Sequence, residues 1–502
     1  MKKILTFALA FAMVLSLAAC GGSTGTADSK SANDRELVMT IGKDLTTLDP
    51  FKCTGSSSWR CCKSIYDVPW VYTKDYQVVY RACTGFEFSE DGLSLTATLR
   101  EGMKFSNGDP VTAEDFAYSI DMCKTGPITL TWASKITNIE VLSDTQVKVT
   151  LDAVYAPLTF AMQDVTIVSK KAHEAASADF GYTPVGSGPY TLGEYKVGDY
   201  VTLKANDSFY NEVGVKNVKY KLIPEAESVS IALQSGEVGY SSDYASIDYE
   251  SLSALENLQV YEMKNLDYEF ATYNVTIAPF DNKYFRQAMN YALDRQSMID
   301  IVANGNGYIE YNIWCDQVFG YKKMEGWPYS VEKAKECLEK AGYPNGEGVP
   351  EITIYCYGDS GAREAQIIQE SLKAIGIEWP VEQVDMNFLW DGQSDGSIAF
   401  SVDGMGLGID ASEYATMLET GGGFNSAWYA NPEMDELFAK AAGTAVESER
   451  LDYYGQIIDL EQEEAPYMVL YYSISKILCD KDLDLSAVKD YTYIYPQYLT
   501  WK

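Results

Sequence analysis

The stretch LREGMKFSNGDPVTAEDF, residues 99–116, contains the local signals from which the fold can be read. The alternating residues that lead into it predict a strand, and Asn107-Gly108-Asp109-Pro110 is a strong turn signal. Thr112-Ala-Glu-Asp115 is a capping-box pattern, which predicts a helix with Phe116 and Ile120 on one face. A strand, a turn and a capped helix therefore follow one another closely, as is typical of an α/β protein.

The remaining residues continue this alternation. Strands are predicted at 36–41, 201–205 and 352–355. Helices are predicted at 228–233, 285–299 and 366–374, after Ser330 as far as Gly342, and after Asn431-Pro432. Gly186-Ser187-Gly188-Pro189-Tyr190 predicts a tight turn that leads into paired strands. No repeat period is present, so the predicted fold class is α/β with mixed sheets.

The composition limits the possible partners. The 502 residues are enough for several domains, and 46% of them are apolar. Lys and Arg number 39 against 72 Asp and Glu, which gives a net charge of −33. Nucleic acids and anionic lipid surfaces would repel such a protein. The acidity could attract cationic ligands, although a solvated acidic surface is the simpler explanation.

The N-terminus predicts export and lipid anchoring. Lys2 and Lys3 precede a short apolar run, which ends in Leu17-Ala18-Ala19-Cys20. We interpret residues 1–19 as a lipoprotein signal peptide, Cys20 as the lipidated first residue, and the Gly- and Ser-rich residues 20–33 as a flexible tether. No later segment is long and apolar enough to cross a bilayer. The predicted location is extracytoplasmic, at the cell membrane.

The cysteines and the single histidine indicate neither a metal site nor a redox centre. Cys20 leaves nine further cysteines and no Cys-x-x-Cys motif. Cys53, Cys61, Cys62 and Cys83 are close enough in sequence to suggest one local disulfide, whose pairing stays open. His173 is the only histidine. No metal and no cofactor are therefore expected.

The sequence does not predict an enzyme. It contains no phosphate-binding loop, so any ATPase must be a separate subunit. His173 lies in the polar stretch 170–178, which does not favour a catalytic base. Asp410 and Glu413 could form the carboxylate pair of a secreted hydrolase, but no motif supports that function.

Several motifs taken together resemble the family 5 extracellular solute-binding proteins, the peptide- and nickel-binding components of ABC importers. These motifs specify turns, caps and helix faces, so they indicate a scaffold more than a chemistry. In sequence order they are Ser89–Gly92, Leu99–Gly102, Lys104-Phe105, Asn107-Gly108, Pro110–Phe116 with Ser119, Val185–Tyr190, Asn206-Asp207 to Tyr210, Gln234–Glu237, Pro279–Asp281 with Arg286–Ala288, Tyr291-Ala292, Asp294-Arg295, and Lys333-Ala334 with Ala341–Tyr343.

The resemblance implies a two-lobed clamshell that closes on a small ligand. It would consist of lobe I (34–65, 186–275 and the tail 480–502), an inserted domain II (66–185) and lobe III (276–479). The expected partners are an organic ligand and the permease and ATPase subunits of an importer, with the binding protein itself a monomer.

The ligand site is expected around residues 403–414. Peptide binders of the family hold the peptide ammonium with the aspartate of a Gly-Trp-x-x-Asp pattern. Here Met405 replaces the tryptophan and Gly408 the aspartate, so Asp403 or Asp410 would have to substitute. Alternatively, Asp410 caps the helix that contains Tyr414. The full set of expected ligand-binding residues is Asp403, Met405, Asp410, Tyr414, Trp428, Ser57, Trp59 and Asn274.

Alternative functions remain open. A peptide is the default ligand by resemblance, and nickel is disfavoured because histidine is scarce. The clusters Trp428-Tyr429, Tyr471-Tyr472 and Tyr491 to Tyr498 could instead line a cleft or stack on a sugar, which favours an oligosaccharide. A ligand-sensing receptor is a further class, and a secreted hydrolase is the third.

Overall fold

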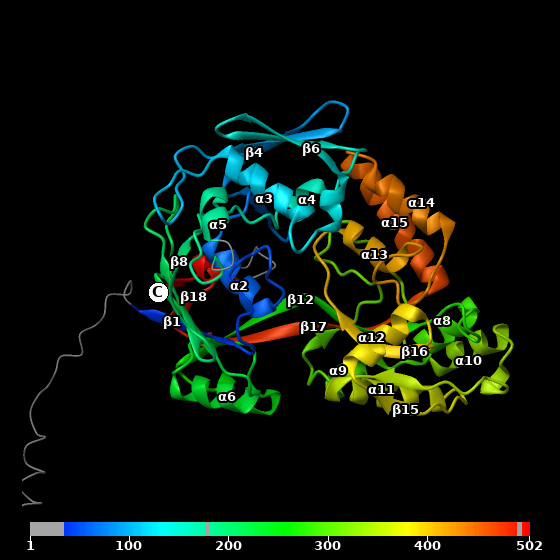
Figure 1. The fold of residues 1–502 in the computed structure, drawn as a ribbon. Coiled ribbons are helices and arrows are strands. Elements are labelled where there is room, and N and C mark those ends of the chain that lie inside the picture. The colour runs from blue at the N-terminus through cyan, green and yellow to red at the C-terminus, as the bar shows by residue number, and fades with distance from the viewer. Residues whose placement is uncertain (1–34, 177–179, 489–493) are drawn as a thin grey trace, which may run out of the picture.

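The computed structural model of the protein describes residues 35–176, 180–488 and 494–502. The predicted signal peptide, Cys20 and the tether lie outside these residues. Figure 1 shows two lobes side by side with a third unit above them. We call the part around β1 and β8–β11 lobe I, the part around β14–β16 lobe III, and the upper unit domain II. No helix of the described residues is both long and apolar enough to span a membrane.

An 11-stranded mixed sheet runs through both lobes, in the order β15-β14-β16-β12-β17-β11-β1-β10-β9-β8, with β13 paired to β17. Its strands are β1 Glu36–Ile41, β8 Tyr190–Lys196, β9 Tyr200–Ala205, β10 Asn217–Leu222, β11 Tyr240–Ser241, β12 Leu258–Tyr273, β13 Gly307–Tyr308, β14 Ile354–Cys356, β15 Val381–Gln383, β16 Phe400–Met405 and β17 Tyr467–Asp480. The strands predicted at 36–41 and 201–205 are confirmed, whereas the third begins two residues later than predicted.

Two long antiparallel strands join the lobes. β12 and β17 pair over most of their lengths, and Figure 1 shows them crossing together from one lobe to the other. Their register shifts between Lys264 and Tyr268, where the pairing is irregular. Such an irregularity bends a strand locally. A bend in the pair of long strands that connects the lobes is a natural hinge position.

Domain II contains a four-stranded antiparallel sheet, β4-β5-β7-β6, with helices against one face (Figure 1). The predicted capping box is present, since the Thr112 backbone N–H donates to the Asp115 carboxylate at 3.0 Å. Phe116 and Ile120 are buried, as predicted. The elements are β4 Cys83–Phe88, β5 Ser94–Leu99, β6 Ile136–Ser143, β7 Gln146–Leu151, α3 Ala113–Thr125, α4 Leu158–Met162 and α5 Lys170–Ala176.

Glycines bring the polypeptide from domain II back to lobe I. The Gly188 N–H donates to the Ile65 carbonyl at 2.9 Å, and a Cβ at Gly186 would collide with that same carbonyl. The turn therefore needs glycine to lie flat against the end of α2, Ser56–Ile65. It leads into the β8–β9 pair, which confirms the predicted paired strands. The boundaries proposed between lobes and domain stay predictions.

The helices of lobe III are α8 Lys283–Ala292, α9 Arg295–Ile301, α10 Val331–Lys340, α11 Gly358–Lys373, α12 Met386–Asp395, α13 Ala415–Leu418, α14 Pro432–Ala442 and α15 Glu447–Glu464. The prediction of one helix over 285–299 is wrong. The helix stops after Ala292, and the Asp294 carboxylate accepts the Ser297 N–H at 3.1 Å. Asp294 therefore caps a second helix, because its carboxylate competes with helical hydrogen bonding.

The smaller elements complete the description. Lobe I also contains α6 Ala226–Ser235 and α7 Tyr249–Ser253. Two short pairs stand apart from the large sheets, β2 Trp70–Tyr72 with β3 Val78–Tyr80, and β18 Leu483–Asp484 with β19 Thr500–Trp501. The predicted helical stops are observed at Gly236 and Gly376, both at positive φ.

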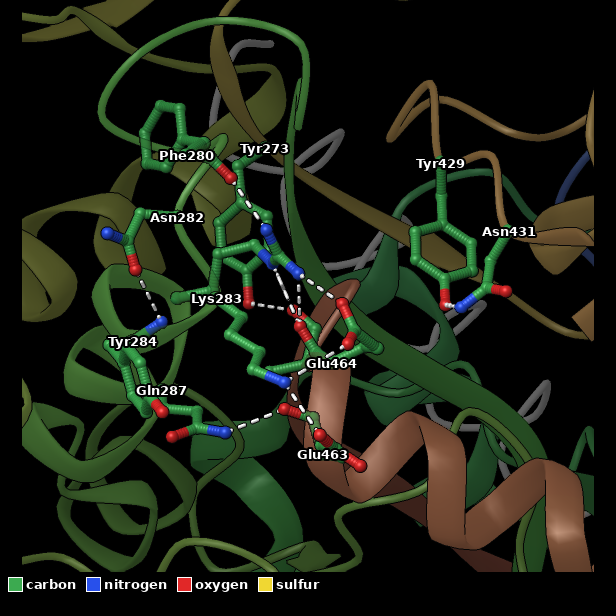
Figure 2. A network of polar contacts seen from close by, with 12 residues as sticks. Tyr273, Phe280, Asn282, Lys283, Tyr284, Gln287, Tyr429, Asn431, Glu463 and Glu464 are labelled. Carbon is green, nitrogen blue, oxygen red and sulfur yellow. Dashed lines mark hydrogen bonds and ion pairs between the residues drawn. The ribbon is translucent and has the colours of Figure 1, made fainter. Parts of the chain in front are cut away.

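A polar network surrounds Arg286, which belongs to the motif that begins at Pro279. Figure 2 shows the start of α8 facing the C-terminal end of α15. The Arg286 guanidinium, 3% exposed, donates to the carbonyls of Glu464, Ala465 and Phe280. Lys283 forms ion pairs with Glu463 and Glu464. The buried arginine thus satisfies the free carbonyls at a helix end, which is a structural role.

The nine described cysteines are all unpaired, so the predicted local disulfide is absent. Cys53, Cys61 and Cys62 lie in the core of lobe I, whereas Cys83 lies in the core that includes domain II. Proximity in sequence was therefore misleading, because the polypeptide passes from one unit to another between Cys62 and Cys83.

Candidate functional site

A cavity of about 500 Å³ lies between the lobes and beneath domain II. Its size falls within the roughly 300–1,000 Å³ of typical small-molecule sites. Lobe I contributes β1, β11 and α2, domain II contributes residues such as Tyr72 and Gln163, and lobe III contributes the loop after β16. Strands β12 and β17 and the C-terminal segment complete the lining. Every unit of the fold therefore touches this space.

Backbone periodicity decides which side chains line the cavity. Along β12, the alternate residues Met263, Asn265 and Asp267 face it, as expected for one side of a strand. Ser475 and Ile477 of β17 do the same, and Asn265 donates to the Ser475 hydroxyl at 2.9 Å. The cavity lining and the irregular pairing of β12 with β17 therefore share the same strand segment.

The Glu413 carboxylate fills the place left by Gly408. A Cβ at Gly408 would collide with that carboxylate, and both residues line the cavity. Although solvent reaches Glu413 through the cavity, burial by the surrounding protein raises the pKa of its carboxyl to about 8, with the Asp164 and Asp410 charges adding to the rise. Among the described residues, no basic group forms an ion pair with Glu413.

Further carboxylates lie beside the same glycine-rich segment. Side chains at Gly404 and Gly406 would collide with the carboxylates of Glu269 and Asp267, respectively. Burial raises the pKa of Asp267, and it raises that of Glu269 to about 8 with help from neighbouring acids. The alternating glycines 404, 406 and 408 thus leave room for acidic groups on one side of the segment. This side of the cleft can stabilise a cation.

The basic lining residues come from α2 and from the strand region that follows it. On α2, the side chains of Ser56, Trp59, Arg60 and Lys63 line the cavity, which is the spacing of one helix face. Lys63 forms an ion pair with Asp164 at 2.5 Å. Arg81, also lining, pairs with the buried Asp67 at 2.7 Å. Arg60 instead donates to the Thr40 carbonyl at 3.2 Å and, among the described residues, forms no ion pair.

The C-terminal segment closes the lining with Tyr495, Gln497 and Tyr498. Tyr498 accepts a hydrogen bond from Arg81 at 2.8 Å. Gln497 is only 8% exposed, yet neither its amide oxygen nor its amide nitrogen has a hydrogen-bond partner among the described residues. A buried unpaired amide is costly, so such groups usually have a role.

Only part of the predicted site lines this cavity. Trp59 does, and so do Gly408, Ile409 and Glu413 of the loop 403–414. Ser57 is buried on the far face of α2, because one residue along a helix turns the side chain by about 100°. Of the tyrosine clusters, Tyr495 and Tyr498 line the cavity, Tyr471 and Tyr472 are buried, and 491–493 lie outside the described residues.

Asp410 and Tyr414 have structural surroundings. Asp410 is fully buried and holds Arg450 through two contacts, at 3.0 and 2.8 Å. It also accepts the Ser412 N–H at 2.9 Å, so the alternative interpretation of Asp410 as a helix cap agrees with the structure. Tyr414 is buried beside Trp314, with ring centroids 5.5 Å apart. Neither side chain lines the cavity.

Three other predicted residues meet at α12, away from the cavity lining. Asp403 is buried and accepts from Gln393 at 3.4 Å, and burial raises the pKa of its carboxyl. The Trp428 indole donates to the Gln393 carbonyl at 2.9 Å, and Asn274 donates to the carbonyl of Gly396 at 3.1 Å. Met405 is half-buried against the central core. We therefore expect these residues to stabilise lobe III rather than to contact the ligand.

Sequence reasoning missed Arg60, Asp267 and Gln497 as site residues and weighed Glu413 only as a hydrolase carboxylate. The helical period starting at Ser56 could have found Arg60, and the alternation along 258–273 could have found Asp267. Nothing local identifies Gln497, because its place in the cavity lining depends on packing between segments that are distant in sequence.

The only histidine is fully engaged elsewhere. His173 contacts the Tyr118 hydroxyl at 2.7 Å and Asp49 at 3.4 Å, and it does not line the cavity. Among residues 35–176, 180–488 and 494–502, no group of three or more His, Cys, Asp or Glu side chains is arranged to hold a metal ion.

Comparisons with known proteins agree with this architecture. The sequence model of the bacterial extracellular solute-binding proteins, family 5, matches residues 69–426. The glutathione-binding protein GsiB of Salmonella typhi is 26% identical over 475 residues, which cover 90% of this chain and 92% of the relative. This family consists of substrate-binding proteins of ABC importers and not of enzymes.

Solved structures share the fold over nearly the whole protein. The ABC transporter substrate-binding protein CtaP of Listeria monocytogenes has a TM-score of 0.84 at 21% identity, covering 93% of this chain and 99% of that one. The oligopeptide-binding protein AppA of Bacillus subtilis, in complex with a nonapeptide, has a TM-score of 0.75 at 23% identity, covering 93% and 99%. These neighbours are two-lobed binding proteins.

Proposed function

We propose, since the chain belongs to the family 5 bacterial extracellular solute-binding proteins, that it captures a short zwitterionic peptide-class ligand between its lobes and delivers it to an ABC permease. The observation that carries this proposal is the polarity of the cavity. Glu413 and Asp267 line it without basic partners among the described residues, and Arg60 lines it without an ion-pair partner among them.

An ammonium group suits the acidic side. A cation placed between Glu413 and Asp267 would favour the ionised carboxylates that burial otherwise disfavours. Relatives named for binding glutathione and a solved neighbour holding a nonapeptide support a ligand with a free amino group. Contact with both lobes would favour the closed state, because a ligand shifts a conformational equilibrium only through differential contacts.

The ligand class can be tested directly by calorimetry and thermal unfolding. We expect free tripeptides such as tri-alanine, or glutathione, to bind and raise the melting temperature. At a ligand concentration of 100 Kd the stabilisation should be about 2.7 kcal/mol. Maltotriose, which carries no charge, serves as the matched oligosaccharide and should have no effect. Stabilisation by maltotriose without any by the peptides would contradict the proposal.

The lipid anchor is proposed from the N-terminal sequence. Leu17-Ala-Ala-Cys20 followed by a Gly- and Ser-rich segment would place the mature protein beside its permease. Tethering raises the local concentration of the binding protein at the transporter.

The anchor makes a separate prediction. Cells that express the wild type and are fed a palmitate analogue should label the protein in the membrane fraction. Cys20→Ala should lose the label and appear in the soluble fraction. Cys53→Ala, in the buried core, is the control and should label normally. Labelled, membrane-bound Cys20→Ala protein would show that the anchor lies elsewhere.

A further inference from the structure

We infer that Arg60 and Gln497, which both line the cavity, form a second subsite that binds the carboxylate and an amide group of the ligand. This inference rests on the proposed function and narrows its substrate class. It implies that the protein selects ligands with a free carboxylate as well as a free ammonium group.

The charge balance of the cavity singles out Arg60. Arg60, Lys63 and Arg81 are its cationic lining residues, and the last two already pair with Asp164 and Asp67. The Arg60 guanidinium uses one N–H on the Thr40 carbonyl, 3.2 Å away, which leaves further donors for another acceptor. A guanidinium fork matches the two oxygens of a carboxylate.

Asp243 of lobe I also lines the cavity, and its carboxylate already accepts hydrogen bonds. It accepts a hydrogen bond from the Thr40 hydroxyl at 3.0 Å and another from the Ser242 hydroxyl at 3.3 Å. The backbone position that Arg60 contacts is therefore itself held in place by Asp243. This arrangement orients Arg60, which forms no ion pair among the described residues.

Gln497 provides the independent observation. Its side chain is 92% buried and lines the cavity, while both amide atoms lack a partner among the described residues. A buried primary amide can donate and accept at once, which is the pattern that a peptide bond offers. An unpaired buried amide costs free energy in the ligand-free protein, and a peptide group would recover it.

The test compares tri-alanine with its C-terminal amide and its N-acetyl form, by calorimetry. The wild type should bind tri-alanine about 30-fold more tightly than the amide, as expected for a charge pair worth about 2 kcal/mol. In Arg60→Gln the affinities for acid and amide should become equal, whereas the N-acetyl form should stay disfavoured. Arg363→Gln, an equal charge change on exposed α11 outside the cavity, should keep the wild-type preference.

The outcomes separate the two proposals. If Arg60→Gln retains the preference for the acid over the amide, the second subsite is wrong while the proposed function stands. If the wild type does not distinguish tri-alanine from N-acetyl tri-alanine, the ammonium side of the proposed function fails. If neither tri-alanine nor the amide binds, the inferred ligand class is wrong.

Gln497→Met distinguishes a binding role from a structural one. Because the amide has no partner among the residues that the structure describes, methionine of similar shape should leave the melting temperature unchanged or raise it. Affinity for tri-alanine should nevertheless fall roughly 10-fold, the equivalent of one hydrogen-bonded group worth about 1.4 kcal/mol. A lower melting temperature with unchanged affinity would overturn the role of Gln497 in binding.

Discussion

Replacing Glu413 with glutamine should weaken binding of a free tripeptide by roughly 2–5 kcal/mol, the range for losing one member of a charge pair that the bound ligand would shield from solvent. Glu413 occupies the space above Gly408 and lines the cavity without a basic partner among the described residues. Asp267 remains nearby in the variant, so a loss near the lower end is expected.

Proton linkage provides a second readout for Glu413. The pKa of its carboxyl is raised to about 8 in the folded protein, so at pH 7 the free protein holds it mainly protonated. A bound ammonium favours the ionised form, and the wild type should therefore release protons on binding. Calorimetry in buffers of different ionisation enthalpy measures this release, which Glu413→Gln should reduce.

Glu436→Gln is the matched control for this experiment. Glu436 lies on the surface of α14, paired with Lys440, and far from the cavity lining. Its loss should change neither affinity nor proton release, because an exposed i,i+4 pair contributes only about 0.5 kcal/mol to stability. Equal affinities of Glu413→Gln and the wild type for tri-alanine would remove Glu413 from the site.

The second large effect is on stability. Asp410→Asn should lower the free energy of unfolding by about 3–5 kcal/mol, because it leaves the buried Arg450 guanidinium without a counter-charge. The ion pair is almost fully buried, since the side chains of Arg450 and Asp410 are only 6% and 0% exposed. Tyr454 joins it, donating to Asp410 at 3.3 Å.

Denaturant unfolding and calorimetry on the same samples check this result. Asp459→Asn on α15 is the control, since its ion pair with Lys322 is exposed and should contribute at most about 1 kcal/mol. Folded Asp410→Asn protein should bind tri-alanine nearly as well as the wild type. A stable variant that has lost binding would return Asp410 to the ligand site.

Much of the fold could be predicted from local signals. The capping box at Thr112, the caps at Ser330 and Asn431, and the stop at Gly236 are each confirmed, because each acts on the backbone within a few residues. The resemblance to family 5 was confirmed for the same reason, since its motifs are turns and caps. The helix over 285–299 failed where Asp294 competed locally with the helix.

The sequence by itself determined the family and the α/β architecture, and it predicts that Gly408 replaces the aspartate of the family's pattern. Only the tertiary structure decided which nearby acids are left without a basic partner among the described residues. Asp410 is the nearest acid in sequence, yet the fold pairs it with Arg450, forty residues away, and buries both. Glu413, a hydrolase candidate at most by sequence, turns into the space that a glycine leaves open. A charged side chain is available to a ligand only if no other residue has neutralised it. Which charged residues form pairs depends on long-range packing, which no local pattern encodes.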